Sequence, residues 1–199
     1  MRPEKLIFLP GAAGSPNFWR PVSDLVHYPA SRSLLGWPAF DRVPRDPNVN
    51  SIADLVAMVV KEMDRPCALI AQSMGGIVAV QAALKRPELL TQLVLAVTSG
   101  GVDMSDAEDW RPSFRAANPQ APSWFADYRE DLSDRIASIK APALLLWGDA
   151  DPISPVAVGK RLHALLPDSR LDVISGGKHD LAVRFAPEVA SLIGEHLAG

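Results

Sequence analysis

The sequence predicts an α/β protein with one parallel sheet, because strand-like and helix-like segments alternate along most of its length. Apolar runs of strand length end in glycine or polar residues, and segments with helical spacing follow them. Such alternation is typical of βαβ units, whose crossovers make neighbouring strands parallel. The chain has 199 residues, which fits a single domain spanning 1–199 with a sizeable core.

The individual elements follow from these patterns in chain order. Strands are expected at 5–9, 31–37, 67–72, 92–97, 143–147 and 170–174. Helices are expected at 17–27, 51–64, 74–85, 155–166 and 181–197. Ser51 is expected to cap the second of these helices, and three prolines make 38–50 a loop.

The composition is that of an ordinary globular protein, with 48% hydrophobic and 22% charged residues. A net charge of −3 offers no basic surface for nucleic acid or for an anionic membrane. No apolar stretch has the length of a membrane span, and the first residues lack the apolar core of a signal peptide. The single cysteine, Cys67, has no internal disulfide partner. We therefore expect a cytoplasmic protein that binds neither nucleic acid nor membrane.

Metal and phosphate sites are not indicated by the sequence. The His, Cys and carboxylate residues lack metal-ligand spacing, and the glycines after the first strand form neither a G-x-G-x-x-G motif nor a P-loop. We therefore predict no metal and no cofactor.

The segment 67–80, CALIAQSMGGIVAV, is the most informative in the chain. An apolar strand ends at a serine, two glycines follow one residue later, and a helical run begins. This layout is typical of a nucleophile elbow, a tight strand-to-helix turn that lifts the hydroxyl of Ser73 above the sheet. Gly75 has the expected position, whereas Ala71 stands where glycine is usual.

Two later strand ends carry the residues that a nucleophilic serine needs, namely a base and an acid that orients it. Asp149 and Asp151 follow the strand at 143–147, and His179 follows the strand at 170–174 after a Gly-Gly turn. The carboxyl ends of parallel strands meet at the same edge of a sheet, where ligands bind.

With these three segments, the chain resembles the α/β-hydrolase superfamily over nearly its whole length, most of all its small esterase and lyase branch with A/G-x-S-M-G-G elbows. The resemblance implies the α/β-hydrolase fold, with about six mostly parallel strands, helices on both faces and no antiparallel pair opening the sheet. It also implies a catalytic triad of Ser73, Asp151 and His179, in which Asp151 is the aspartate of a G-x-x-D-P turn. Asp149 is its rival, and Asp103 is a weaker third candidate for the acid.

An oxyanion hole is expected beside the serine, because acyl transfer places negative charge on an oxygen. The backbone N–H of Met74, at the start of a helix, is one predicted donor. The resemblance implies the backbone N–H of Ala12 as the second, although this chain has Pro10 where related proteins usually carry histidine.

The stretch from 102 to 140 interrupts the alternation and corresponds to the place where larger relatives insert a cap domain, so a minimal cap is expected. It is rich in aromatic residues, including Trp110, Trp124 and Phe125. These rings either form an apolar wall of the substrate pocket or only attach the insertion to the body, and the sequence leaves both open.

The predicted function is that of a serine hydrolase acting on a carboxylic ester or a related small acyl substrate through an acyl-enzyme. Two alternatives stay open: a non-hydrolytic lyase that uses the same triad, and a non-catalytic ligand-binding protein on a hydrolase scaffold. The expected partner is a small-molecule substrate. The sequence leaves the oligomeric state open.

Overall fold

The computed structural model describes residues 1–102, 104, 109–119 and 121–199, and its centre is a parallel sheet. The strands are β1 (Lys5–Leu9), β2 (Ser31–Leu34), β3 (Cys67–Gln72), β4 (Leu90–Ala96), β5 (Ala143–Gly148) and β6 (Ser169–Ile174). Across the described residues they form one 6-stranded sheet in the order β2-β1-β3-β4-β5-β6, and every neighbouring pair is parallel. The predicted α/β fold is therefore confirmed, and the sheet is wholly rather than mostly parallel.

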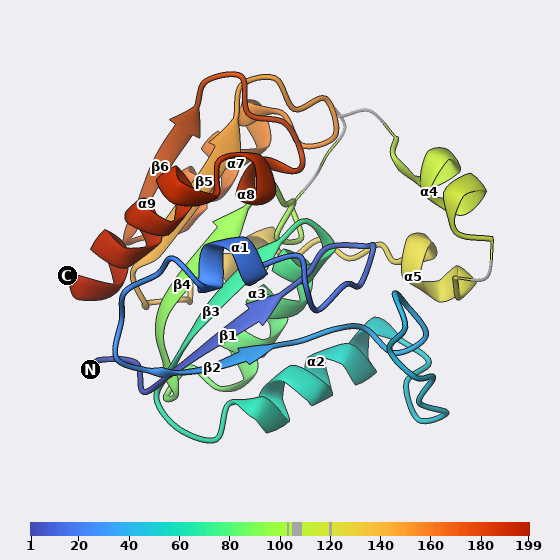
Figure 1. Cartoon of the computed structure of the whole chain (residues 1–199), viewed down its shortest axis with the longest axis horizontal. Coiled ribbons are helices and arrows are strands. Elements are labelled where there is room, and N and C mark those ends of the chain that lie inside the picture. The colour runs from blue at the N-terminus through green and yellow to red at the C-terminus, as the bar shows by residue number, and fades with distance from the viewer. Residues whose placement is uncertain (103, 105–108, 120) are drawn as a thin grey trace.

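The sheet is buried because helices cover both of its faces (Figure 1). α1 (Arg20–Ser23), α8 (Leu181–Arg184) and α9 (Ala186–Ala198) contact one another on one face. α2 (Ile52–Glu62), α3 (Met74–Lys85), α6 (Ser133–Ile136) and α7 (Val156–Leu165) form a second connected layer. Burial on both faces explains why β3, β4 and β5 are buried along their entire length, whereas the edge strands β2 and β6 are partly exposed.

Two predicted helices are wrong in extent, and proline explains where α1 and α9 begin. The helix expected at 17–27 is reduced to α1, which begins at Arg20 with Pro21 in its first turn. The helix expected at 181–197 is divided into α8 and α9 at Phe185. Pro187 has no N–H to donate to the carbonyl one turn earlier, so a helix can begin there but cannot continue through it.

The first and last residues of the insertion after β4 lie next to each other. Leu132 N–H donates a hydrogen bond to Gly101 O at 2.8 Å, so the excursion from the body that starts after Gly101 ends at Leu132. This excursion carries α4 (Arg111–Ala117) and α5 (Ser123–Asp127), which lie to the right of the sheet in Figure 1. The later helix α6 contacts α3 and α7 and so belongs to the body rather than to the cap.

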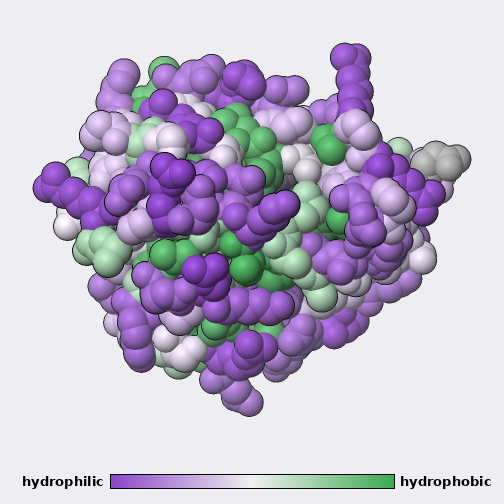
Figure 2. Space-filling model, turned by 90° about the horizontal axis from the view of Figure 1, so that it is seen from below, coloured by the Kyte–Doolittle hydropathy of each residue, from purple (hydrophilic) through white to green (hydrophobic). Residues whose placement is uncertain are grey.

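The outer surface is mainly polar on the side that carries α2. Figure 2 shows this face covered largely by hydrophilic residues, with hydrophobic ones visible between them. In the described part of the chain, no helix combines the length and the apolar character that crossing a bilayer requires.

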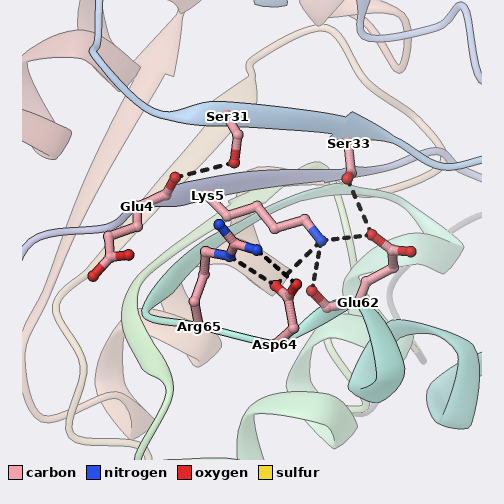
Figure 3. Close-up of polar contacts among 7 residues, drawn as sticks. All are labelled: Glu4, Lys5, Ser31, Ser33, Glu62, Asp64 and Arg65. Atoms are coloured by element: carbon pink, nitrogen blue, oxygen red, sulfur yellow. Dashed lines mark hydrogen bonds and ion pairs between the residues drawn. The ribbon is translucent and has the colours of Figure 1, made fainter.

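A network of polar side chains connects the end of α2 to β1 and β2 (Figure 3). The Lys5 ammonium donates to Glu62 O and Glu62 Oε2, both at 2.8 Å, and to Asp64 Oδ1 at 3.4 Å. Ser33 Oγ on β2 donates to Glu62 Oε2 at 3.0 Å, and Arg65 pairs with Asp64. All three ammonium protons therefore have acceptors in this network, which joins β1, β2 and α2.

We expect Lys5→Met, which keeps the length of the side chain, to lower the melting temperature by a few degrees at neutral pH. The hydrogen bond from Arg65 lowers the pKa of Asp64 to about 2, and the hydrogen bond from Lys5 also lowers the pKa of Glu62. Carboxylates with a depressed folded-state pKa stabilise above their unfolded pKa of about 4, and this stabilisation is lost as the pH falls towards 2. The difference between the two proteins should therefore shrink between about pH 4.5 and pH 2. Thermal melts of both proteins across this pH range measure the effect. A difference in melting temperature that stays constant from pH 4.5 to pH 2 would contradict the prediction.

Candidate active site

Ser73 lies on a strained turn between β3 and α3. Its backbone has φ of 52° and ψ of −124°, in a region that residues with a side chain rarely adopt. Three hydrogen bonds hold it there: Ser73 N–H donates to Ala96 O at 3.0 Å, and Ser73 O accepts from Gly76 N–H at 2.9 Å and from Thr98 Oγ1 at 2.5 Å. The surrounding strand and helix therefore impose the conformation of this turn.

Two glycines allow the turn to pack so tightly. A Cβ at Gly75 would lie 2.4 Å from Pro10 O, and a Cβ at Gly76 would lie 2.4 Å from Thr98 Oγ1. Because both contacts are shorter than any real Cβ contact, a side chain at either position would push the turn away from its neighbours. Ala71, where the pattern usually has glycine, is fully buried and lies in register with Leu9 of β1 and Leu95 of β4.

The structure brings Ser73, His179 and Asp151 into one hydrogen-bonded chain. His179 Nε2 lies 2.9 Å from Ser73 Oγ, and His179 Nδ1 lies 2.8 Å from Asp151 Oδ2. The Asp151 side chain is fully buried, and its other oxygen, Oδ1, accepts from Ile153 N–H at 2.9 Å. An ionised carboxylate only accepts, so Nδ1 carries the proton and Nε2 is free to accept from the serine hydroxyl.

The rival carboxylate has a different position. Asp149 is exposed, and it accepts from Gly176 N–H at 2.6 Å and from Ser175 Oγ at 3.2 Å. These bonds satisfy the turn that follows β6, so Asp149 shapes the loop that leads to His179. The third candidate, Asp103, lies outside the described residues.

The loops after β5 and β6 meet at two glycines. A Cβ at Gly148 would lie only 2.1 Å from Gly177 O, and Ala150 N–H donates to that same oxygen at 3.0 Å. This close backbone approach places the loop with Asp151 beside the loop with His179. Gly148 and Gly177 belong to two turns that are recognisable in the sequence, but their contact is visible only in the structure.

The loop after β1 is held beside Ser73 by two buried tryptophans. Trp19 Nε1–H donates to Leu9 O at 2.8 Å, and Trp37 Nε1–H donates to Gly11 O at 3.0 Å. Ala12, one predicted oxyanion donor, follows directly and lines the cavity at Ser73. The other, Met74, is the first residue of α3.

Gln72 is a functional candidate that sequence analysis missed, although its place next to Ser73 could have drawn attention to it. The side chain is 5% exposed, and its Nε2–H donates to His179 O at 3.1 Å. A Cβ at Gly11 would lie 2.2 Å from Gln72 Oε1, so the amide also packs against the loop after β1. One side chain thus contacts the serine turn, the histidine loop and the loop of Ala12.

A cavity of about 450 Å³ opens at Ser73 and His179. Of the predicted pocket residues, Trp110 lines this cavity, whereas Trp124 and Phe125 lie outside its described walls. Phe125 is fully buried and packs on Phe40, with ring centroids 4.9 Å apart, so it attaches the insertion to the body. Trp110 therefore lies at the cavity, whereas Phe125 attaches the insertion to the body.

Within the described part of the chain, no three or more His, Cys, Asp or Glu side chains are grouped so that they could hold a metal ion. The arrangement allows the Ser73 hydroxyl to transfer a proton to His179 next to an apolar cavity.

Comparison with known proteins identifies the family of this chain. The family model described as "Alpha/beta hydrolase family" matches residues 6–106, more than half of the 199 residues. The chain belongs to the alpha/beta hydrolase family. The matched part contains β1, β3 and Ser73, while Asp151 and His179 follow it in the sequence.

Two of the relatives that the chain matches are hydrolases by name. The "Uncharacterized hydrolase YugF" of Bacillus subtilis (strain 168) is 29% identical over 195 residues, covering 74% of this chain and 70% of that protein. The "Serine hydrolase BPHL" of Mus musculus is 26% identical over 181 residues, covering 77% of this chain and 62% of that protein, so less than two thirds of its length. A hydrolase from Pseudomonas aeruginosa PA01 has a TM-score of 0.83 at 19% identity, covering 100% of this chain and 91% of that chain. At this identity, the structural likeness shows the alpha/beta hydrolase fold.

Proposed function

We propose that this member of the alpha/beta hydrolase family is a serine hydrolase that cleaves a carboxylic ester or a related small acyl compound. The observation that supports this most directly is the chain of hydrogen bonds from Asp151 through His179 to Ser73, at 2.8 and 2.9 Å. The mouse relative named a serine hydrolase adds support from sequence.

In the proposed mechanism, Ser73 Oγ attacks the carbonyl carbon of the ester while His179 Nε2 accepts its proton. The tetrahedral intermediate collapses, the alcohol leaves with that proton, and the acyl group stays on Ser73. Water then attacks the acyl carbon and passes a proton to His179. The bond from the acyl carbon to Ser73 Oγ breaks, His179 returns the proton to Ser73, and the acid is released. Asp151 holds the imidazole in the required tautomer and stabilises its positive charge.

The negative oxygen of each tetrahedral intermediate needs fixed donors. We assign this role to the backbone N–H groups of Ala12 and Met74. The hydrogen bonds from Trp19 and Trp37 keep the loop of Ala12 in place, so this donor does not have to reorganise during the reaction.

The proposal is tested by labelling the purified protein with a fluorophosphonate probe, together with hydrolysis of p-nitrophenyl butanoate in H₂¹⁸O. We expect labelling, turnover and one ¹⁸O atom in the released acid, and loss of all three in Ser73→Ala. Burial raises the pKa of the Cys67 thiol to about 11, so the cysteine does not compete for the probe.

Other outcomes would favour the other functions. A serine that is labelled in a protein that hydrolyses no ester would point to a lyase. A folded wild-type protein that is neither labelled nor active would overturn the proposed hydrolase and favour a ligand-binding protein.

Gln72 is expected to position the histidine loop rather than to touch the substrate carbonyl. We expect Gln72→Met to lower kcat by about 10- to 100-fold, because the partly buried carbonyl of His179 loses its donor and the imidazole shifts. Steady-state kinetics, with a melting curve for each protein, measures this effect.

The chain offers a matched control for this variant. Gln92 is also buried, and its amide donates to the backbone oxygen of another histidine, His196, at 2.5 Å. Gln92→Met should lower the melting temperature by a similar amount to Gln72→Met but leave kcat unchanged. Equal losses of kcat in the two variants would show that Gln72 acts only through stability.

A further inference from the structure

The cavity at Ser73 has an apolar wall and almost no charge. Its described lining includes the rings of Phe18, Trp110 and Phe114 and the side chain of Ile153. Among the described residues that line it, only His179 and Asp180 are ionisable, and Asp180 is already paired with Arg184 Nε at 2.9 Å. A negatively charged substrate group would therefore find no cation in these walls, and burying an unpaired charge is costly.

A second cavity of about 680 Å³ lies next to the first. Its described lining is much more polar and includes Asp109, Arg111, Arg129 and Glu130. Trp110 is the residue that appears in the described lining of both cavities. Its indole therefore lies at the boundary between an apolar space at Ser73 and a charged space beyond.

The position of Trp110 is supported by a row of aromatic rings. Trp110 contacts Phe114 edge to face, with centroids 5.3 Å apart, and Phe114 stacks on Phe125 at 5.9 Å. Phe125 in turn packs on Phe40 of the body. Because aromatic pairs of this kind are attractive and Phe125 is fully buried, the indole is held by packing that reaches the body of the protein.

We propose that Trp110 determines the specificity of this site by ending the apolar cavity, so that the enzyme accepts uncharged esters with a short to medium apolar acyl group. The inference rests on the proposed function. As part of this proposal we assign the acyl group, which is bonded to Ser73 in the acyl-enzyme, to the cavity that Ser73 lines. A volume of about 450 Å³ is near the lower end for ligand pockets, so the position of the indole limits the length of the chain.

The test uses p-nitrophenyl esters from butanoate to dodecanoate, together with one pair whose acyl chains end in a methyl group and in a carboxylate. The pair is p-nitrophenyl hexanoate and the mono-p-nitrophenyl ester of adipic acid, which have the same number of acyl carbons. For the wild type we expect kcat/KM to be at least about 100-fold higher for hexanoate, and to fall steeply with acyl length. Adipate cleaved as fast as hexanoate would overturn the uncharged substrate class.

The role of the indole is tested with Trp110→Ala and with the smaller change Trp110→Phe. Removing the wall should raise the decanoate-to-butanoate ratio of kcat/KM at least about tenfold, and phenylalanine should give an intermediate value. Tyr28→Ala removes a partly buried aromatic side chain that lies outside both described linings, and it should leave this ratio unchanged. An unchanged ratio in both Trp110 variants, or the same change in Tyr28→Ala, would overturn the assignment of Trp110.

Failure of the proposed function gives a different result. In that case the wild type is not labelled by the fluorophosphonate and cleaves none of the esters, and the specificity assignment is overturned with it. A wild type that is labelled and active but shows no preference for length or charge overturns this inference alone.

Discussion

Ser73→Ala and His179→Ala are each expected to lower kcat for ester hydrolysis by about 10³- to 10⁶-fold. The serine oxygen is the proposed attacking atom, and the imidazole, 2.9 Å away, is the acceptor of its proton. Because the two residues act in the same step, the double variant should be little slower than either single variant. Single-turnover and steady-state kinetics on the three proteins test this, and additive losses would contradict a shared step.

The two aspartates after β5 provide an internal comparison for the acid. Asp151→Asn should lower kcat by about 10⁴-fold, because an amide in place of the buried carboxylate favours the wrong imidazole tautomer. Asp149→Asn changes the same atoms two residues earlier, where the side chain is exposed and caps the turn of Gly176. It should keep kcat within about tenfold. A larger loss in Asp149→Asn than in Asp151→Asn would reverse the assignment.

Gly148→Ala is expected to destabilise the protein by about 2–4 kcal/mol and to lower kcat by about 100-fold. The new methyl group would lie 2.1 Å from Gly177 O, and a backbone atom cannot rotate away as a side chain can. The loops that carry Asp151 and His179 must therefore separate. Chemical denaturation and kinetics on the same preparation measure the two effects.

Gly194→Ala is the matched control for this substitution. Gly194 lies within α9, and a Cβ there would meet no atom within 4 Å. Alanine is the better helix former, so this variant should gain about 0.5–1 kcal/mol and keep its activity. If Gly148→Ala were equally harmless, the close approach of the two loops would not be required for the site.

Much of the fold could be predicted because its elements are local and strongly patterned. The limits of β1, β3 and α3 agree with the predicted segments, since each is a continuous apolar or helical run bounded by residues that end it. Helices with proline in the first turn were predicted less well. At Pro187 a single residue divides one apolar stretch into two helices, and apolar spacing alone does not show it.

The candidate site was only partly accessible from the sequence. Ser73 and His179 stand beside glycines at strand ends, which made them candidates, and parallel strands bring such ends to one edge. The resemblance favoured Asp151 over Asp149, and the hydrogen bonds of the two differ: Asp151 contacts His179, whereas Asp149 contacts the turn of Gly176. Trp110 lines the cavity, whereas Phe125 packs on Phe40 of the body. The sequence could not separate them, because both are aromatic residues of one insertion.

The sequence by itself therefore determined the alternation of strands and helices, the serine turn and the family, because these depend on the order of neighbouring residues. The tertiary structure alone decided the contact of Gly148 with Gly177, the bond from Gln72 to the histidine loop and the place of Trp110 between two cavities. Each of these joins segments far apart in the chain. Such contacts depend on how strand ends and loops pack in space, and no local pattern specifies that packing.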